Sequence, residues 1–230
     1  MDKRGKLIDI EGGDGAGKAT QTKMLAERLK AEGYEVATFS FPRYYESNSG
    51  KLIGELLAGK HGDFMSVPPY ISALPYAMDR GTARDSIQEA LEKGAIVICD
   101  RYTSSNLAHQ SAKLPKDEQA TLVEFIESLE YGDLRLPRPD VVMYLSVPTD
   151  VSAELVSKKE AREYTGGEKR DQAERNMAHQ DRTRAAYLRL AEEKGWNIVE
   201  CAPEGSLRAP EDIHEEVSRI VHEALGATIQ

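Results

Sequence analysis

The residues with the clearest chemical potential form a glycine-rich stretch near the start of the chain. It reads Gly12-Gly13-Asp14-Gly15-Ala16-Gly17-Lys18-Ala19-Thr20 and matches the pattern G-x-x-x-x-G-K. Glycines in such a turn let backbone N–H groups face phosphate oxygens at the positive end of the following helix. Lys18 is then placed to reach the outer phosphates. The alternative, a chance glycine turn, is disfavoured because an apolar run precedes the stretch and a helical pattern follows it. The stretch therefore predicts a phosphate site.

Three arginines are placed to hold a second anionic substrate. Arg43 and Arg101 each follow an apolar run, and Arg80 lies four residues after Tyr76 on one predicted helix face. Guanidinium groups suit a phosphate monoester, and an aromatic ring suits a flat base. A single arginine is more often a solvated surface charge, but two of these end strands next to the glycine-rich stretch. Asp100 is open to two interpretations, a magnesium-bound water or a pair with an arginine.

A basic segment at about 157–175 has the composition of a lid. Its cations surround two glycines and are Lys158, Lys159, Arg162, Lys169 and Arg170. The alternative is an exposed charged loop, which suits most of these residues. A segment of this kind after a strand is suited to close over a transferring phosphoryl group and exclude water. Asp171 and Glu174, on one predicted helix face, direct carboxylates toward the same region.

Alternating strands and helices must position these residues. Apolar runs predict strands at 7–11, 36–41, 95–100, 141–147 and 197–201. Helical spacing predicts helices at 17–32, around 87–91, at 122–129 and at 213–225. Strands that are apolar on both faces and alternate with helices indicate a parallel sheet covered on both sides. We expect an α/β fold with three α/β/α layers and a five-stranded parallel sheet, with ligands at the carboxyl ends of the strands.

Composition and charge restrict the class of protein. A chain of 230 residues without repeats, low-complexity blocks or a linker suits one domain. Its net charge of −9, from 39 acidic and 30 basic residues, disfavours nucleic acid and anionic membranes as partners. The N-terminus lacks the apolar core of a signal peptide, and no apolar run approaches the ~18 residues of a membrane span. Cys99 and Cys201 lie in apolar runs and are interpreted as buried hydrophobes. These features predict a cytoplasmic enzyme.

Several stretches together resemble the thymidylate kinase family of P-loop nucleoside-monophosphate kinases. They span most of the chain in the family's order and are Glu11 to Lys18, Phe41-Pro42-Arg43-Tyr44, Asp79-Arg80, Asp100-Arg101-Tyr102 with Ser105-Asn106, and Leu136-Pro137-Arg138-Pro139-Asp140. The glycine-rich stretch is generic, whereas the Phe-Pro-Arg and Asp-Arg-Tyr pair is more discriminating. The resemblance implies one kinase domain over residues 1–230 with a P-loop NTPase fold. It also implies a homodimer that transfers the γ-phosphoryl group of Mg-ATP to dTMP, giving dTDP and ADP.

The resemblance implies roles for individual residues. Backbone amides from Gly12 to Thr20, with Lys18, would hold the ATP phosphates. Arg43 and Arg101 would grip the monophosphate, Tyr76 would stack on thymine, and Arg80 with Asn106 would read the edge of the base. The other residues implied for the dTMP site are Asp14, Phe41, Tyr44, Ser105 and His109.

The implied catalytic groups are cations and carboxylates around the phosphates. Lys18, Asp14 and Arg101 are expected to act, together with a lid cation, Arg162 or Arg170. Little covalent participation is needed, because the acceptor phosphate oxygen is already anionic. The expected cofactor is Mg²⁺, with Asp14, Asp100 and Glu174 as its carboxylates.

Some positions depart from the family pattern. Ala19 stands where a hydroxyl usually touches the metal, which predicts weaker magnesium binding rather than lost activity. His109 stands where the family often has Tyr, which affects discrimination against ribose. Ser146 replaces a common Asp, and Pro75 is expected to kink its helix or begin a new turn.

Two rival functions follow from these features. A non-catalytic nucleotide-binding protein is suggested by Ala19, but it would have no use for converging arginines and a basic lid. The second rival is a P-loop kinase for another nucleoside or nucleoside monophosphate. A neutral hydroxyl acceptor would leave Arg43 and Arg101 facing nothing anionic, which favours a monophosphate.

Overall fold

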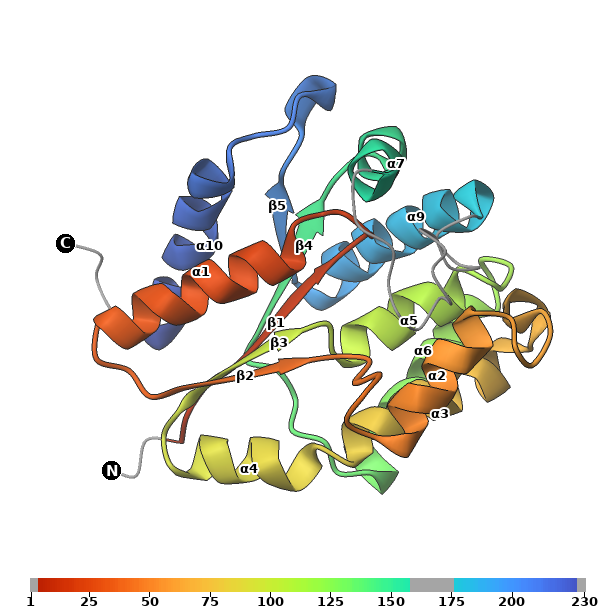
Figure 1. Ribbon diagram of the computed structural model, residues 1–230, viewed down its shortest axis with the longest axis horizontal. Helices are drawn as coiled ribbons and strands as arrows, with labels where there is room; N and C mark the ends of the chain where they lie inside the picture. Colours follow the sequence, from red (N-terminus) through yellow and green to blue (C-terminus); the bar gives the residue numbers. More distant parts are fainter. Residues whose placement is uncertain (1–3, 158–175, 227–230) are drawn as a thin grey trace.

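A parallel five-stranded sheet forms the centre of the molecule. The computed structural model describes residues 4–157 and 176–226, and its strand order is β2-β3-β1-β4-β5 (Figure 1). The strands are β1 (Leu7–Gly12), β2 (Val36–Ser40), β3 (Ile96–Asp100), β4 (Val141–Ser146) and β5 (Asn197–Glu200). Every neighbouring pair is parallel. The predicted α/β fold with a five-stranded parallel sheet is confirmed, and each predicted strand matches one of these five.

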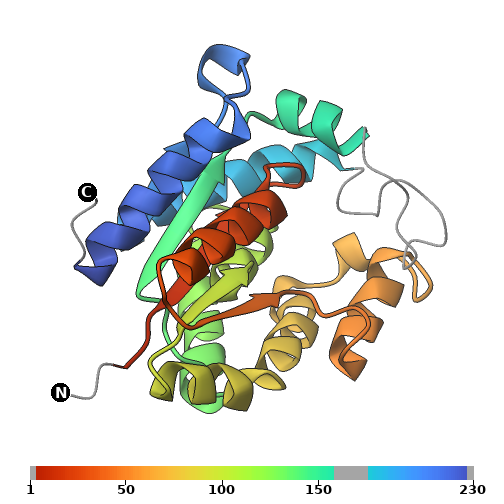
Figure 2. The ribbon, with the colours of Figure 1, turned by 60° about the vertical axis from the view of Figure 1, so that its left-hand side comes forward.

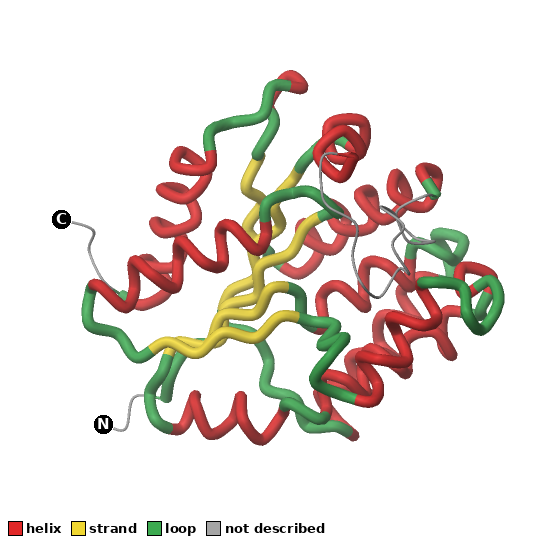
Figure 3. The backbone as a smooth tube through the Cα atoms, viewed as in Figure 1, coloured by secondary structure: helices red, strands yellow, loops and turns green. Residues whose placement is uncertain are grey.

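Helices lie on both faces of the sheet (Figures 2 and 3). The α-helices are α1 (Lys18–Ala31), α2 (Asn48–Leu57), α3 (Pro69–Gly81), α4 (Arg84–Glu92), α5 (Thr103–Ser111), α6 (Gln119–Glu127), α7 (Thr149–Ser157), α9 (Met177–Lys194) and α10 (Pro210–Leu225). Short 3₁₀ turns are η1 (Phe64–Ser66) and η4 (Pro203–Gly205), and η2 (Ser128–Asp133) is a π-helical turn. Helices α1 and α10 pack together on one face, while α5, α6 and α9 share a core on the other.

The central strand is buried on both faces, as its sequence requires. Every residue of β1 is buried. Ile8 and Ile10 point to the core beneath α1 and α10, and Leu7 points to a second core that includes residues of α4 and β3. Asp9 and Glu11 alternate with these isoleucines, so β1 directs two carboxylates toward the face covered by α5 and α9. The strand thereby places polar groups at the layer that forms the site.

Two smaller expectations concern a proline and the cysteines. Helix α3 continues through Pro75, and a kink at this proline stays a prediction. Cys99 and Cys201 are buried free thiols, which confirms that they act as small hydrophobes. Among the described residues, no helix is long and apolar enough to cross a membrane.

Candidate active site

A cavity of about 550 Å³ opens where β1, β2 and β3 end, with the glycine-rich loop after β1 on one side and helices α3 and α5 on the other. Parallel α/β sheets bind ligands at this edge. The cavity therefore brings the glycine-rich loop together with Arg80, Arg101 and Tyr76 of the second group that the sequence singled out.

The glycine-rich loop has the backbone conformation of a phosphate cradle. Gly15 and Gly17 have φ values of 83° and 86°, a left-handed region that side chains disfavour. Gly17 caps α1 without a side-chain hydrogen bond, which leaves N–H groups of the first turn free to meet an anion. The predicted strand–loop–helix context of this stretch is confirmed.

Lys18 is folded back over the loop. Its Nζ donates to the carbonyl oxygens of Gly12 at 3.1 Å and Gly13 at 2.8 Å, and the residue is 8% exposed. Burial, followed by the nearby Arg101, lowers the pKa of Lys18 to about 8. Incoming phosphate oxygens would favour the charged amine and replace these weaker carbonyl contacts.

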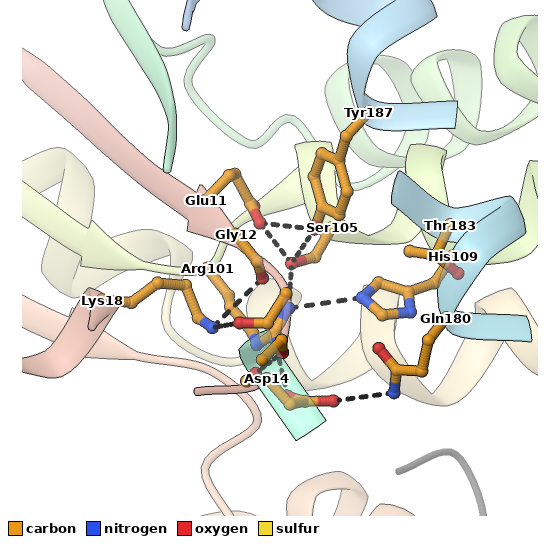
Figure 4. Close-up of polar contacts among 12 residues, drawn as sticks. Glu11, Gly12, Asp14, Lys18, Arg101, Ser105, His109, Gln180, Thr183 and Tyr187 are labelled. Atoms are coloured by element: carbon orange, nitrogen blue, oxygen red, sulfur yellow. Dashed lines mark hydrogen bonds and ion pairs between the residues drawn. The ribbon is translucent and has the colours of Figure 1, made fainter. Parts of the chain in front are cut away.

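Arg101 and Asp14 form the ion pair between the two sides of the cavity (Figure 4). Nη2 of Arg101 lies 2.7 Å from Oδ1 of Asp14, and Oδ2 of Asp14 accepts from Gln180 of α9 at 3.3 Å. Burial opposes charge on Asp14, but Arg101 and Lys18 hold its pKa well below the usual value. Arg101 has a φ of 68°, and such strained residues concentrate at functional sites. The prediction that Arg101 ends a strand beside the loop is confirmed.

Glu11 supports the segment that carries Arg101 from the interior of the protein. It is fully buried and accepts hydrogen bonds from the backbone N–H of Tyr102 at 2.9 Å, the hydroxyl of Ser105 at 2.6 Å and the phenol of Tyr187 at 2.7 Å. One carboxylate thereby joins β1, the residue after Arg101, α5 and α9. The network fixes the backbone that carries Arg101.

Two histidines face each other beside the ion pair. The rings of His109 and His179 are 6.0 Å apart, and both line the cavity. Nη1 of Arg101 lies 3.3 Å from Nε2 of His109. A guanidinium only donates, so Nε2 of His109 must accept and its proton lies on Nδ1. Burial, then Arg101 and His179, lowers the pKa of His109 well below its usual value, so the ring is neutral.

The far end of the cavity has aromatic walls and a buried ion pair. Phe41, Tyr44 and Tyr76 line it, and their contact with a flat base stays a prediction. Arg80, which is 2% exposed, also lines it and forms an ion pair with Glu130 at 2.6 Å. Ser105 and Asn106 of α5 complete this wall.

Arg43 lies apart from the cavity lining. Its guanidinium contacts the carboxylate of Asp79 at 3.3 Å and the carbonyl of Asp79 at 3.0 Å, and it also donates to Thr82. Its backbone N–H donates to Asp79 as well. The structure therefore shows Arg43 joining the loop after β2 to α3, while a grip on the monophosphate stays a prediction.

The remaining predicted residues concern metal and lid. Asp14 and Asp100 line the same cavity, next to Lys18. Magnesium in phosphoryl-transfer sites is held by substrate phosphates, water and one or two carboxylates, so this pair fits such an ion. The described residues contain no group of three His, Cys, Asp or Glu side chains that would hold a metal unaided. The lid segment and its residues Arg162, Arg170 and Glu174 lie outside the described residues.

Comparison with known proteins decides the family. The family model described as thymidylate kinase matches residues 10–216. This chain belongs to the thymidylate kinase family. Curated thymidylate kinases resemble it over most of its length: that of Mycobacterium tuberculosis (strain ATCC 25618 / H37Rv) is 37% identical over 190 residues, 83% of this chain and 87% of that protein. The Caulobacter vibrioides enzyme is 33% identical over 223 residues, 97% and 99% of the two chains. The predicted family and the predicted class of nucleotide-binding kinase are confirmed.

A solved structure supports the fold of this family member. The thymidylate kinase of Candida albicans matches with a TM-score of 0.73 over 96% of this chain and 92% of that chain. At 23% identity, the match supports the shared fold alone.

Sequence reasoning assigned no role to several residues of this thymidylate kinase family site. Glu11 and Glu130 are buried anchors, and His179, Gln180 and Tyr187 reach the site from α9. The available signal was an acidic residue inside an otherwise apolar stretch, as in Leu7-Ile8-Asp9-Ile10-Glu11. Carboxylates are rarely buried without partners, so such a residue indicates a buried polar network.

Proposed function

We propose that this chain transfers the γ-phosphoryl group of Mg-ATP to dTMP, producing dTDP and ADP. The observation that carries the proposal is the position of Arg101. It lies between the phosphate loop, through Asp14, and the aromatic end of the cavity, through Ser105 and His109. This position suits the boundary between a triphosphate and a nucleoside monophosphate.

The chain's own residues would act mainly by alignment and charge. Lys18 and the loop amides would bind the outer ATP phosphates, while Arg101 would hold the acceptor phosphate in line with them. The acceptor oxygen is already anionic, so no strong general base is required. Asp14 would keep Arg101 oriented, and the buried walls would exclude water from the reacting groups. A protein that bound nucleotides without catalysis would have no use for Arg101 in this position.

Magnesium fits the carboxylates present. Asp14 and Asp100 would hold the ion together with phosphate oxygens and water, in the absence of a hydroxyl at Ala19. When bound, the ion supplies charge neutralisation at the phosphates.

We also propose that the enzyme is a homodimer in the cytoplasm. Ile71, Leu74 and Met78 recur at helical spacing on α3 and are 57%, 37% and 51% exposed. An apolar stripe of this kind suits contact with a second copy. The two free cysteines suit a reducing compartment.

A coupled assay of ADP formation tests the reaction. The enzyme would be given ATP with dTMP, dUMP, AMP or thymidine in separate reactions, and a Lys18→Ala variant would control for contaminating kinases. We expect turnover with dTMP and much less with AMP or thymidine. Faster turnover of AMP or thymidine than of dTMP would contradict the proposal.

A further inference from the structure

Glu130 is the centre of a buried polar cluster behind the aromatic end of the cavity. It lies in the π-helical turn η2 and is 0% exposed. Its carboxylate accepts four hydrogen bonds: Nε and Nη2 of Arg80 at 2.6 Å each, the hydroxyl of Thr103 at 2.8 Å, and Nδ2 of Asn106 at 2.8 Å. Each carboxylate oxygen takes two of them. Because the buried carboxylate of Glu130 has partners on both oxygens, it holds each of its donors in a fixed position.

The cluster fixes which way the amide of Asn106 faces. Nδ2 donates to Glu130 and to the carbonyl of Ala73 at 3.1 Å, so both of its protons are used. A carboxylate and a carbonyl only accept, so turning the amide over would place its oxygen against two acceptors. Oδ1 therefore stays on the opposite side, where it is buried without a hydrogen-bond partner among the described residues. Asn106 lines the cavity, and Oδ1 is its one side-chain acceptor that no donor among the described residues satisfies.

The same cluster fixes Arg80. Two of its five N–H groups donate to Glu130, which leaves three for other acceptors. Arg80 is nearly fully buried and lines the cavity beside Asn106. Oδ1 of Asn106 and the remaining N–H groups of Arg80 are therefore the acceptor and the donors that this wall would present to a bound base.

This pattern is complementary to one class of pyrimidine. Thymine and uracil present a donor at N3 and an acceptor at O4, whereas cytosine presents an acceptor at N3 and an amino donor at C4. We propose that Glu130 is a positioning residue that sets base specificity, by holding Asn106 and Arg80 so that the cavity takes a keto-pyrimidine and rejects an amino-pyrimidine. The proposal rests on the proposed function, dTMP phosphorylation. A substrate of nearly the same shape is rejected effectively when its binding leaves buried polar groups of the site unpaired.

The isosteric substitution Glu130→Gln tests the proposal. A glutamine head accepts on one side only, so Arg80 loses part of its clamp and the amide of Asn106 is free to reverse. We expect kcat/KM for dTMP to fall by about 10–100-fold and the ratio of kcat/KM for dTMP to that for dCMP to fall by at least about 10-fold. The change should appear in KM for dTMP while KM for ATP stays within about 2-fold.

Thr103→Val is the matched control. It removes one hydroxyl donor from Glu130 but leaves the contacts to Arg80 and Asn106, so the dTMP/dCMP ratio should stay within about 2-fold of the unsubstituted enzyme. Thermal midpoints of both variants separate folding from specificity. An equal change in both variants, or a folded Glu130→Gln variant with an unchanged ratio, would overturn the role of Glu130.

A ligand experiment on the unsubstituted enzyme does not depend on variant folding. N3-methyl dTMP lacks the donor that Asn106 Oδ1 requires, so it should compete with dTMP at least about 100-fold more weakly than dUMP does. Equal competition would show that no acceptor faces N3 and would overturn the proposal. If the unsubstituted enzyme did not phosphorylate dTMP at all, that result would instead contradict the proposed function.

Discussion

Arg101 joins the glycine-rich loop to the wall of the cavity that α5 forms. It donates to Asp14 at 2.7 Å, to Ser105 at 3.2 Å and to His109 at 3.3 Å, and its backbone is held in a left-handed conformation. Burial opposes its charge, but Asp14, followed by other negative groups, raises its pKa above the usual value. A permanently charged and restrained guanidinium is suited to hold a phosphate monoester without reorganisation.

Arg101→Ala should mainly weaken dTMP binding. A hydrogen bond to a charged group contributes about 1.5–3 kcal/mol, so KM for dTMP should rise by about 10–150-fold. KM for ATP should change much less, because Lys18 and the loop amides remain. Steady-state kinetics with each substrate varied in turn measures the two constants. A KM for dTMP that does not move would contradict the role assigned to Arg101.

His179 should make the folded protein sensitive to acid. Burial, followed by Lys113 and Arg182, lowers its pKa from 6.5 to about 4. Between those values the unfolded chain binds a proton that the folded chain does not, so stability falls as the pH drops from 6.5 toward 4. Denaturant unfolding of a His179→Leu variant should show a loss over this window that is smaller by on the order of 3 kcal/mol. At pH 8, where both states carry a neutral ring, this difference in pH dependence should be absent; an unchanged acid slope would argue against a buried neutral His179.

At the scale of elements, the first turn of α1 affects how the proposed magnesium ion would be held. Ala19 lines the cavity in this turn and is exposed, but it offers no oxygen. Asp14 and Asp100 are the described carboxylates beside it. The turn would therefore supply amide donors to phosphate and leave metal ligation to other groups.

Ala19→Ser should restore a ligand at this turn. We expect the Mg²⁺ concentration for half-maximal activity to fall, with kcat changed by less than about 3-fold. A magnesium titration at fixed ATP and dTMP measures this. Ala16→Ser, a buried position in the same loop, gives the comparison for the effect of a hydroxyl as such. If both variants keep the magnesium dependence of the unsubstituted enzyme, Ala19 is not the cause of weaker metal binding.

The elements could be predicted from the sequence more fully than the contacts between their side chains. Strands such as Ile96–Asp100 are short apolar runs, and the glycine-rich loop needs glycine where φ is positive. Both can therefore be recognised from residues that are close together in the sequence. The pair Arg80–Glu130 joins residues 50 positions apart, and Tyr187 reaches Glu11 across 176 positions. Spacing carries no information about such partners. For the same reason, the pairing of Arg43 with Asp79 was not predicted from the sequence.

At the scale of the whole molecule, the exposed apolar stripe of α3 is suited to a second subunit. Nearby, the ring of Tyr70 packs edge-on against Phe125 of α6, with centroids 5.1 Å apart, and both rings are 37% exposed. Scattered apolar residues are normal on a surface, but a stripe with adjacent aromatic rings is typical of interfaces.

Met78→Glu should weaken the dimer. A charge in the centre of a buried apolar contact should raise the dimer dissociation constant by at least about 10-fold. Sedimentation velocity over a concentration series measures this. Leu207→Glu places the same charge at a 48% exposed leucine outside α3 and should leave assembly unchanged. A monomeric unsubstituted protein at every concentration would exclude the proposed dimer.

Helix α3 has two working sides. Tyr76 and Arg80 line the cavity, while Ile71, Leu74 and Met78 are exposed to solvent. In a dimer formed through α3, this helix would contact a nucleotide on one side and the second subunit on the other. If nucleotide binding in one subunit tilts α3, the movement would reach the other subunit across the two-fold axis. The shape of the saturation curve for dTMP would then show whether binding at the two sites is cooperative.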